Sequence, residues 1–169
     1  MRFYLLGFMG SGKSYWAKRW SAKYEFDFYD VDDTNEAMEM NSVVDLFEKK
    51  GEQWYREKEA AVLRELNNYQ DCIISCGGGT PCYHENMDWM NQNGFTIYLE
   101  STPEYLLQNI LKEKERRPLV KNVNESELLY FIQQKLEERI PIYNQAQLTL
   151  NAAAVSETTL GGILYSLNR

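Results

Sequence analysis

The sequence contains little histidine, cysteine or proline: one His, three Cys and four Pro among 169 residues. Cys72, Cys76 and Cys82 form no C-x-x-C pair and His84 stands alone, so the pattern does not indicate a tetrahedral zinc site. We expect the thiols to be free, as in a reducing cytoplasm. No apolar run approaches the roughly 20 residues needed to span a bilayer, which also favours a cytoplasmic protein without a membrane partner.

Positive charge is also scarce. The chain has 18 Lys and Arg against 25 Asp and Glu, which gives a formal net charge of -7 at pH 7. This excess of negative charge repels nucleic acid and anionic lipid, so neither is expected as a partner. An arginine near a motif therefore indicates a specific anionic ligand. With 44% hydrophobic residues, we expect one domain over residues 1–169, acting as a monomer.

Short apolar runs alternate with longer stretches of helical pattern along the chain. Several of the runs are apolar nearly throughout, which is typical of strands covered on both faces of a parallel sheet. Thr102 before Pro103 marks the start of one helix. The alternation predicts a three-layer α/β/α fold. We expect strands at residues 3–6, 26–29, 72–76, 95–99 and 148–150, and helices at 13–24, 42–50, 52–69, 84–93, 103–114, 125–138 and 157–167.

The segment from Gly7 to Ser14 matches the phosphate-loop pattern G-x-x-x-x-G-K-[ST], after an expected strand and at the start of an expected helix. Its glycines let backbone N–H groups turn toward phosphate oxygens, and the helix N-terminus adds partial positive charge. Lys13 is expected to reach the β- and γ-phosphates, and Ser14 to bind Mg²⁺. The alternative is a glycine-rich turn without a ligand. The residues expected to bind ATP here are Gly10, Ser11, Gly12, Lys13, Ser14 and Tyr15.

An acidic run, Asp30 to Asp33, follows the second expected strand. The third expected strand ends in glycines and offers no metal-binding Asp, so the carboxylate of a magnesium site must come from elsewhere. Side chains alternate between the two sides of an extended chain, so Asp30 and Asp32 would lie on the same side. One could bind the metal and the other could contact an acceptor hydroxyl. The alternative is a solvated acidic turn, with Asp33 capping a helix that begins near Thr34.

Gly77, Gly78 and Gly79 leave the end of the third expected strand without side chains, so a small ligand could approach the backbone N–H groups; a plain loop is the alternative.

Two arginines suit a substrate carboxylate, because arginine binds carboxylates through two parallel hydrogen bonds. They are Arg56, with Glu59 three residues on, and Arg139, at the end of an expected helix. Taken singly, each arginine could instead be an ordinary surface residue.

The segment 115–124 has no helical or strand period and is a candidate for a mobile lid. It contains Arg116-Arg117-Pro118-Leu119. A lid arginine can cover a transferring phosphate and stabilise its developing charge, while closure excludes water. The alternative is a solvated basic pair.

The order of these motifs resembles that of the shikimate kinase family over nearly the whole chain. The motifs are the phosphate loop, Asp30-x-Asp32, the segment Gly51 to Glu59, the three glycines, Arg117-Pro118-Leu119 and Arg139-x-Pro141-x-Tyr143. The resemblance implies a P-loop kinase fold with a five-stranded parallel sheet of order 2-3-1-4-5, a substrate-binding helical region at about 31–60 and a lid at about 112–124. It also implies that ATP, with Mg²⁺, phosphorylates the 3-hydroxyl of shikimate, a step toward chorismate and the aromatic amino acids.

Residue roles carry over motif by motif. The resemblance implies that Lys13, Asp32 and Arg117 are catalytic, and that Arg117 also contacts ATP. It implies a magnesium site at Ser14 and, through water, at Asp30. The residues that it assigns to shikimate are Asp32, Arg56, Gly77, Gly78, Gly79 and Arg139.

Two departures from the family pattern concern the nucleotide side. Tyr15-Trp16-Ala17 stand where the family usually has Thr-x-Gly, so the packing of the first helix under the loop is altered. Asn109 stands near the position where many members have an arginine against adenine, which leaves the adenine contact open. The alternatives are a gluconate-like kinase of the same fold, a catalytically silent nucleotide-binding relative, and a nucleic-acid-binding ATPase, which the acidic charge disfavours.

Overall fold

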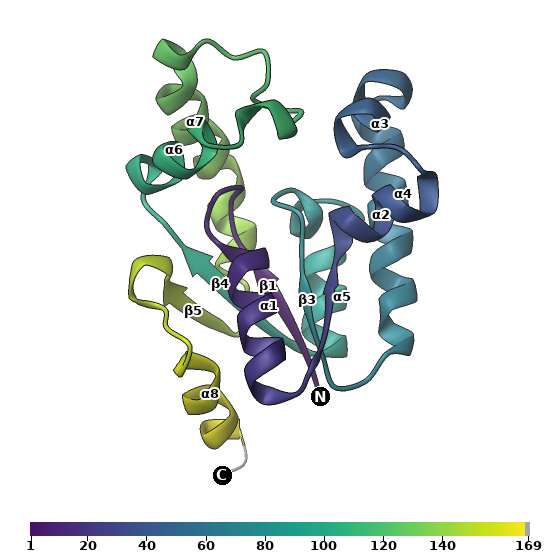
Figure 1. The fold of residues 1–169 in the computed structure, drawn as a ribbon, viewed down its shortest axis with the longest axis vertical. Helices are drawn as coiled ribbons and strands as arrows, with labels where there is room; N and C mark the ends of the chain where they lie inside the picture. Colours follow the sequence, from purple (N-terminus) through teal and green to yellow (C-terminus); the bar gives the residue numbers. More distant parts are fainter. Residues whose placement is uncertain (168–169) are drawn as a thin grey trace.

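The computed structural model describes residues 1–167, which form a five-stranded parallel sheet of order β2-β3-β1-β4-β5 (Figure 1). The predicted strand order is therefore confirmed. The strands are β1 (Arg2–Leu6), β2 (Asp27–Asp30), β3 (Cys72–Ser75), β4 (Phe95–Glu100) and β5 (Leu148–Asn151).

The helices alternate with these strands along the chain. They are α1 (Lys13–Tyr24), α2 (Val31–Glu39), α3 (Val43–Lys50), α4 (Glu52–Glu65), α5 (Asn86–Asn93), α6 (Pro103–Leu111), α7 (Glu125–Tyr143) and α8 (Thr159–Leu167). Short 3-10 turns lie at Leu66–Asn68, Thr80–Cys82, Lys114–Arg116 and Ala152–Ala154. Over the described residues, each helix is too short or too polar to cross a membrane. The three cysteines are free thiols.

The alternating side chains of β1 explain the three layers. Phe3 and Leu5 pack in the cluster formed with α1 and α8, whereas Tyr4 and Leu6 pack in the cluster formed with α4 and α5. All four side chains are fully buried, as expected for the central strand of a parallel sheet. A third cluster joins α6, α7 and the lid, where Val120 is fully buried and anchors the lid to α7.

Helix α2 begins at Val31, where the acidic run was expected to be extended and a helix from near Thr34 was only the alternative. Asp30 ends β2 and caps α2: its Oδ1 accepts hydrogen bonds from the backbone N–H groups of Asp32 at 3.0 Å and Asp33 at 3.3 Å. Asp32 therefore lies in the first helical turn, and the prediction of an extended chain from Asp30 to Asp32 is wrong. The alternative had Asp33 capping a helix that begins near Thr34. A helix is present, but it begins at Val31 and is capped by Asp30, whose carboxylate bonds the free N–H groups at this end.

Helix α7 continues through Pro141 to Tyr143, beyond its predicted end at residue 138. Arg139 thus lies inside this helix, not at its end as predicted. A proline inside a helix is unfavourable, but Tyr143 is fully buried, packs on Tyr98 with ring centroids 5.0 Å apart, and donates to the Gly78 carbonyl at 2.5 Å. These tertiary contacts favour the last turn. The ends of other helices differ from the predicted ones by a few residues.

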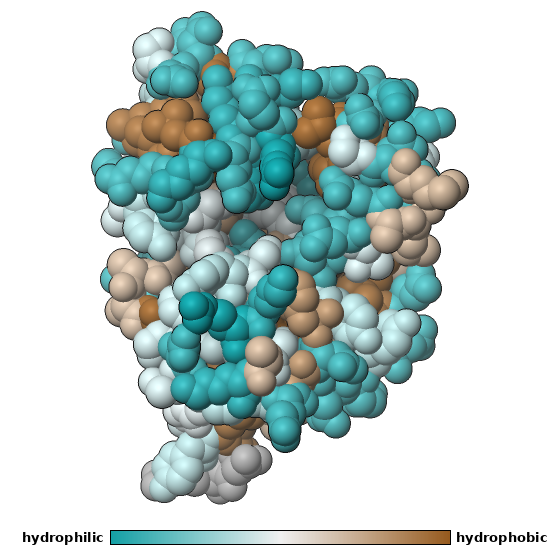
Figure 2. Space-filling model, in the orientation of Figure 1, coloured by the Kyte–Doolittle hydropathy of each residue, from teal (hydrophilic) through white to brown (hydrophobic). Residues whose placement is uncertain are grey.

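Two groups of helices rise above the carboxyl ends of the strands (Figure 1). One contains α2, α3 and α4, and the other contains α6, α7 and the lid segment between them. The loop that follows β1 lies between the two groups. The face of the molecule drawn in Figure 2, in the same orientation, is largely hydrophilic and is hollowed near its centre. Ligands of parallel α/β folds bind at this end of the sheet, which is where the predicted site residues gather.

Candidate active site

The loop from Gly7 to Ser14 turns from β1 into α1. Gly10 (φ 82°) and Gly12 (φ 91°) adopt left-handed conformations that other residues rarely take. Gly12 is the N-cap of α1 and gives no side-chain hydrogen bond, so the first N–H groups of this helix remain available to an anion. Asn109 of α6 holds the loop in place, since its Nδ2 donates to the Gly10 carbonyl at 2.9 Å.

Lys13 lies beneath this loop and is only 7% exposed. Its Nζ donates to the Phe8 carbonyl at 2.9 Å. Burial lowers the pKa of Lys13 to about 8, and the positive charge of Arg117 acts in the same direction, while Asp30 opposes it. A bound anion would provide the counter-charge that this buried ammonium needs.

Ser14, Asp30 and Ser75 bring three side-chain oxygens together at the ends of α1, β2 and β3. Ser14 Oγ donates to Asp30 Oδ2 at 2.6 Å and lies 3.0 Å from Ser75 Oγ. Hard oxygen donors of this kind fit Mg²⁺, which takes only one or two protein ligands beside phosphate and water oxygens. No cluster of three or more His, Cys, Asp or Glu side chains suited to a metal occurs among residues 1–167.

Asp32 faces the same space from the first turn of α2. Its Oδ1 accepts a hydrogen bond from Tyr55 Oη at 2.6 Å. Burial and the negative charge of Asp30 raise the pKa of Asp32, while the Tyr55 hydrogen bond and the charge of Arg117 oppose this rise. The carboxylate is therefore held in a fixed orientation close to Lys13 and Arg117.

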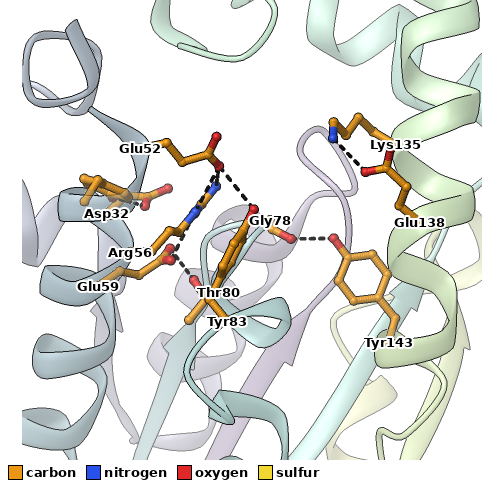
Figure 3. A network of polar contacts seen from close by, with 11 residues as sticks. Asp32, Glu52, Arg56, Glu59, Gly78, Thr80, Tyr83, Lys135, Glu138 and Tyr143 are labelled. Carbon is orange, nitrogen blue, oxygen red and sulfur yellow. Dashed lines mark hydrogen bonds and ion pairs between the residues drawn. The ribbon is translucent and has the colours of Figure 1, made fainter. Parts of the chain in front are cut away.

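Arg56 forms the centre of a buried ionic network on α4 (Figure 3). Its Nη1 lies 3.0 Å from Glu59 Oε2, and its Nη2 lies 2.9 Å from Glu52 Oε1. Thr80 Oγ1 donates to Glu59 Oε1 at 2.5 Å. Burial raises the pKa of Glu59 to about 7, against the Arg56 charge, which favours the ionised form. Arg56 is thus rigidly held, with part of its donor capacity left for a ligand.

Loss of the Glu59 carboxylate should destabilise the protein. Glu59→Ala leaves the buried Arg56 without its inner partner, and breaking a buried pair costs about 3 kcal/mol or more of unfolding free energy. The exposed pair of Lys135 and Glu138 on α7 has the same i,i+3 spacing and is the matched control. Glu138→Ala should cost under about 1 kcal/mol. Urea unfolding of both variants measures the difference, and equal losses would contradict the buried role of Glu59.

The glycines after β3 allow this network to pack against the backbone. A Cβ at Gly79 would lie 2.5 Å from the Arg56 Cζ, and a Cβ at Gly77 would lie 2.6 Å from Glu59 Oε1 and 2.9 Å from Asp32 Oδ1. A side chain at either position would therefore displace charged groups of the site. The predicted plain-loop alternative does not account for such close approach.

Arg139 approaches from α7 on the other side of the glycines and is only 5% exposed. Its guanidinium lies 5.4 Å from the Phe8 ring, and a Cβ at Gly78 would lie 3.4 Å from its Nη1. Within the described part of the chain, this Nη1 is buried without a hydrogen-bond partner. A buried, unpaired guanidinium donor is costly, so its presence here indicates an anionic ligand.

Arg56 and Arg139 line one cavity, which we term the arginine cavity. The lid and α3 cover it, and the Lys121–Glu48 ion pair at 3.0 Å joins the lid to α3. Its lining includes Asp32, Phe47, Arg56, Gly77, Gly78, Gly79, Pro118, Leu119 and Arg139.

A second cavity, of about 490 Å³, opens over the phosphate loop, and we term it the loop cavity. Its lining includes Lys13, Ser14, Trp16, Tyr105 and Asn109.

Arg117 of the lid lines both cavities. Its Nη2 pairs with Glu113 Oε2 at 3.0 Å, and its Nε is buried without a hydrogen-bond partner among the described residues. The neighbouring Arg116 is exposed to solvent. Arg117 is therefore the lid arginine that can meet a group passing between the two cavities.

Comparison with known proteins agrees with this arrangement. A family model described as shikimate kinase matches residues 9–161. A shikimate kinase of Bacteroides thetaiotaomicron is 38% identical over 152 residues, covering 90% of this chain and 87% of that protein. The chain belongs to the shikimate kinase family.

Solved shikimate kinase structures share the fold over the whole domain. The crystal structure from Bacteroides thetaiotaomicron has a TM-score of 0.91 at 34% identity, covering 100% of this chain and 99% of that one. The shikimate kinase from Acinetobacter baumannii, solved in complex with shikimate, has a TM-score of 0.86 at 28% identity, covering 99% and 92%. The expected family, P-loop fold and activity class, an ATP-dependent kinase, are confirmed.

The shikimate kinase motifs thus converge on two adjoining cavities, although the residue roles drawn from them stay predictions. Several other site residues were not predicted. Tyr55 orients Asp32, Thr80 holds Glu59, and Ser75 contacts Ser14. Only Ser75 gave any signal, because it lies near the carboxyl end of an expected strand, whereas no local pattern marks Tyr55 or Thr80 as site residues.

Proposed function

We propose that this shikimate kinase family member transfers the γ-phosphoryl group of ATP to the 3-hydroxyl of shikimate, giving shikimate 3-phosphate and ADP. The unpaired Nη1 of Arg139 carries the proposal, because it is a buried donor without a partner among the described residues and lies in a small cavity beside the phosphate loop, where an anion can bind. Shikimate is a carboxylate with three hydroxyls, so it offers both the anion and the acceptor. The product would serve the synthesis of aromatic amino acids in the cytoplasm.

The arginine cavity would bind the acceptor. Arg139 would bind the shikimate carboxylate with Arg56, which lines the same cavity. Asp32 would accept a hydrogen bond from the reacting hydroxyl and take up its proton. The Tyr55 hydrogen bond would orient that carboxylate. Backbone groups of Gly77, Gly78 and Gly79 would contact the ring hydroxyls.

The loop cavity would bind the donor. Backbone N–H groups of Gly10 to Ser14 and of Tyr15 would surround the phosphates, with Lys13 on the β- and γ-phosphate oxygens. Ser14, and Asp30 through water, would hold Mg²⁺, which when bound neutralises phosphate charge. Arg117 would stabilise the charge that develops on the transferring group, while the lid excludes water. The chain would thus act chiefly by alignment and charge stabilisation.

The acceptor assignment is tested by release of ADP in a coupled assay with shikimate, quinate, gluconate or no acceptor. We expect rapid release with shikimate and little with the other three. Activity with gluconate alone would replace the assignment by a gluconate-like kinase. Absence of activity with every acceptor, despite nucleotide binding, would indicate a catalytically silent relative.

Arg139→Lys should raise the KM for shikimate by about tenfold or more, because a single ammonium cannot form two parallel hydrogen bonds with a carboxylate. The KM for ATP should change little, since Arg139 lines the arginine cavity and not the loop cavity. Initial rates at varied shikimate and fixed ATP measure the effect. An unchanged KM for shikimate would count against the carboxylate contact.

A further inference from the structure

The two cavities set the direction in which a nucleotide lies. They share Asp32, Gly77, Gly78 and Arg117, so the γ-phosphate end of a donor must face this junction. The phosphate loop also lines the loop cavity. The nucleoside must then lie at the end away from the junction. Among the residues that line the loop cavity but not the arginine cavity, we place Tyr15, Trp16, Tyr105, Asn109 and Lys112 at this far end.

Trp16 is held rigidly at this far end. It lies on the first turn of α1, half-buried, and its Cδ1 would be 3.5 Å from a Cβ at Gly12, so the indole borders the phosphate loop directly. Its ring packs on Trp20, with centroids 6.1 Å apart, and at 82° to the ring of Tyr15, 5.0 Å away. These contacts fix the indole, so little side-chain entropy remains to be lost on binding a ligand.

Tyr105 of α6 belongs with Trp16 to the apolar cluster that also contains Val155, and it lines the loop cavity. Asn109, one turn further along α6, has both ends of its amide engaged: Nδ2 donates to Gly10, and Oδ1 accepts from Lys112 Nζ at 3.3 Å. The amide thus serves the loop. The surfaces left for a nucleoside at this end are mainly aromatic.

We propose that Trp16, with Tyr105, forms the surface on which the purine base of the nucleotide stacks. The inference rests on the proposed function, since it takes the phosphates to lie on the loop from Gly10 to Ser14. A flat base gains dispersion and desolvation free energy on an aromatic ring. Residues 15–17, where this chain departs from the Thr-x-Gly of the family pattern, would thus place a stacking residue next to the phosphates.

The test compares two ligands in each variant by titration calorimetry. Trp16→Leu keeps an apolar side chain but removes the aromatic face, so ADP should bind about tenfold more weakly. Inorganic pyrophosphate has no base, and its affinity should change by less than about twofold. Trp16→Phe should retain much of the ADP affinity. Tyr105→Leu, on another helix, should show the same selective loss.

Trp89→Leu is the matched control, because Trp89 is also half-buried but packs on Tyr4, in the cluster on the other face of the sheet. It should leave both affinities unchanged. Equal weakening of ADP and pyrophosphate in Trp16→Leu would assign Trp16 to support of the loop and overturn the stacking proposal, as would unchanged ADP binding. Failure of the proposed function looks different, because the unaltered protein would then bind neither ligand or release no ADP with shikimate.

Discussion

Replacing Lys13 with alanine is expected to lower turnover by about a thousandfold, the scale seen when a preorganised charge at a phosphoryl or oxyanion site is removed. Lys13 is buried, bonded to the Phe8 carbonyl and placed within the phosphate loop. Its ammonium is destabilised by burial before the nucleotide binds, which the lowered pKa of about 8 reflects. Phosphate oxygens that gain charge in the transition state would therefore interact with it strongly in a site of low polarity.

Lys18→Ala is the control for this experiment. Lys18 lies on the same helix but is exposed, so its loss should leave turnover nearly unchanged. Steady-state rates at saturating ATP and shikimate, together with a circular dichroism spectrum to verify folding, measure both variants. Near-normal turnover of a folded Lys13→Ala protein would contradict the assignment of this lysine.

Arg117→Ala is expected to lower kcat by about a thousandfold while the affinity for ADP falls much less, because the arginine would act on charge present only in the transition state. The geometry supports this separation. Arg117 lines both cavities, pairs with Glu113 and has a buried Nε without a partner among the described residues. It is therefore available at the junction where the phosphoryl group would pass.

Arg116→Ala separates this role from a general effect of lid charge. Arg116 is exposed and lines neither the arginine cavity nor the loop cavity, so its variant should keep kcat within about threefold of the original, as expected for an isolated surface charge. Parallel losses of kcat in both variants would favour a contribution of overall lid charge instead. A loss in Arg117→Ala that appears in the KM for ATP alone would contradict a role in the transition state.

The sequence predicted the features that depend on local pattern. The phosphate loop is continuous, the strands are apolar runs, and the order of motifs led to the sheet order and to the family. The start of helix α2 was missed because Asp30 to Asp33 is an acidic run whose helical start depends on one capping carboxylate. The end of α7 was missed because Pro141 disfavours a helix locally, whereas the buried ring of Tyr143 favours one.

The contacts within the site lie further beyond the reach of sequence patterns. Tyr55 on α4 donates a hydrogen bond to Asp32 on α2, and Thr80, which follows β3, donates one to Glu59 on α4. Arg56 was predicted to bind a carboxylate, and the sequence places Glu59 three residues on, on the same side of a helix. The second partner, Glu52, follows from the helical spacing only once the start of α4 is known. The residue roles, the single-domain boundary and the monomeric state stay predictions.

The close approach of Gly79 to Arg56 makes these two positions dependent on each other. A Cβ at residue 79 would occupy the space of the guanidinium, so an arginine at position 56 can keep this orientation only if residue 79 is glycine. In newly sequenced genomes, the two positions read together would therefore separate chains able to build this acceptor site from relatives that share only the phosphate loop. The residue at position 56 alone, or at position 79 alone, would distinguish these two groups of chains less well.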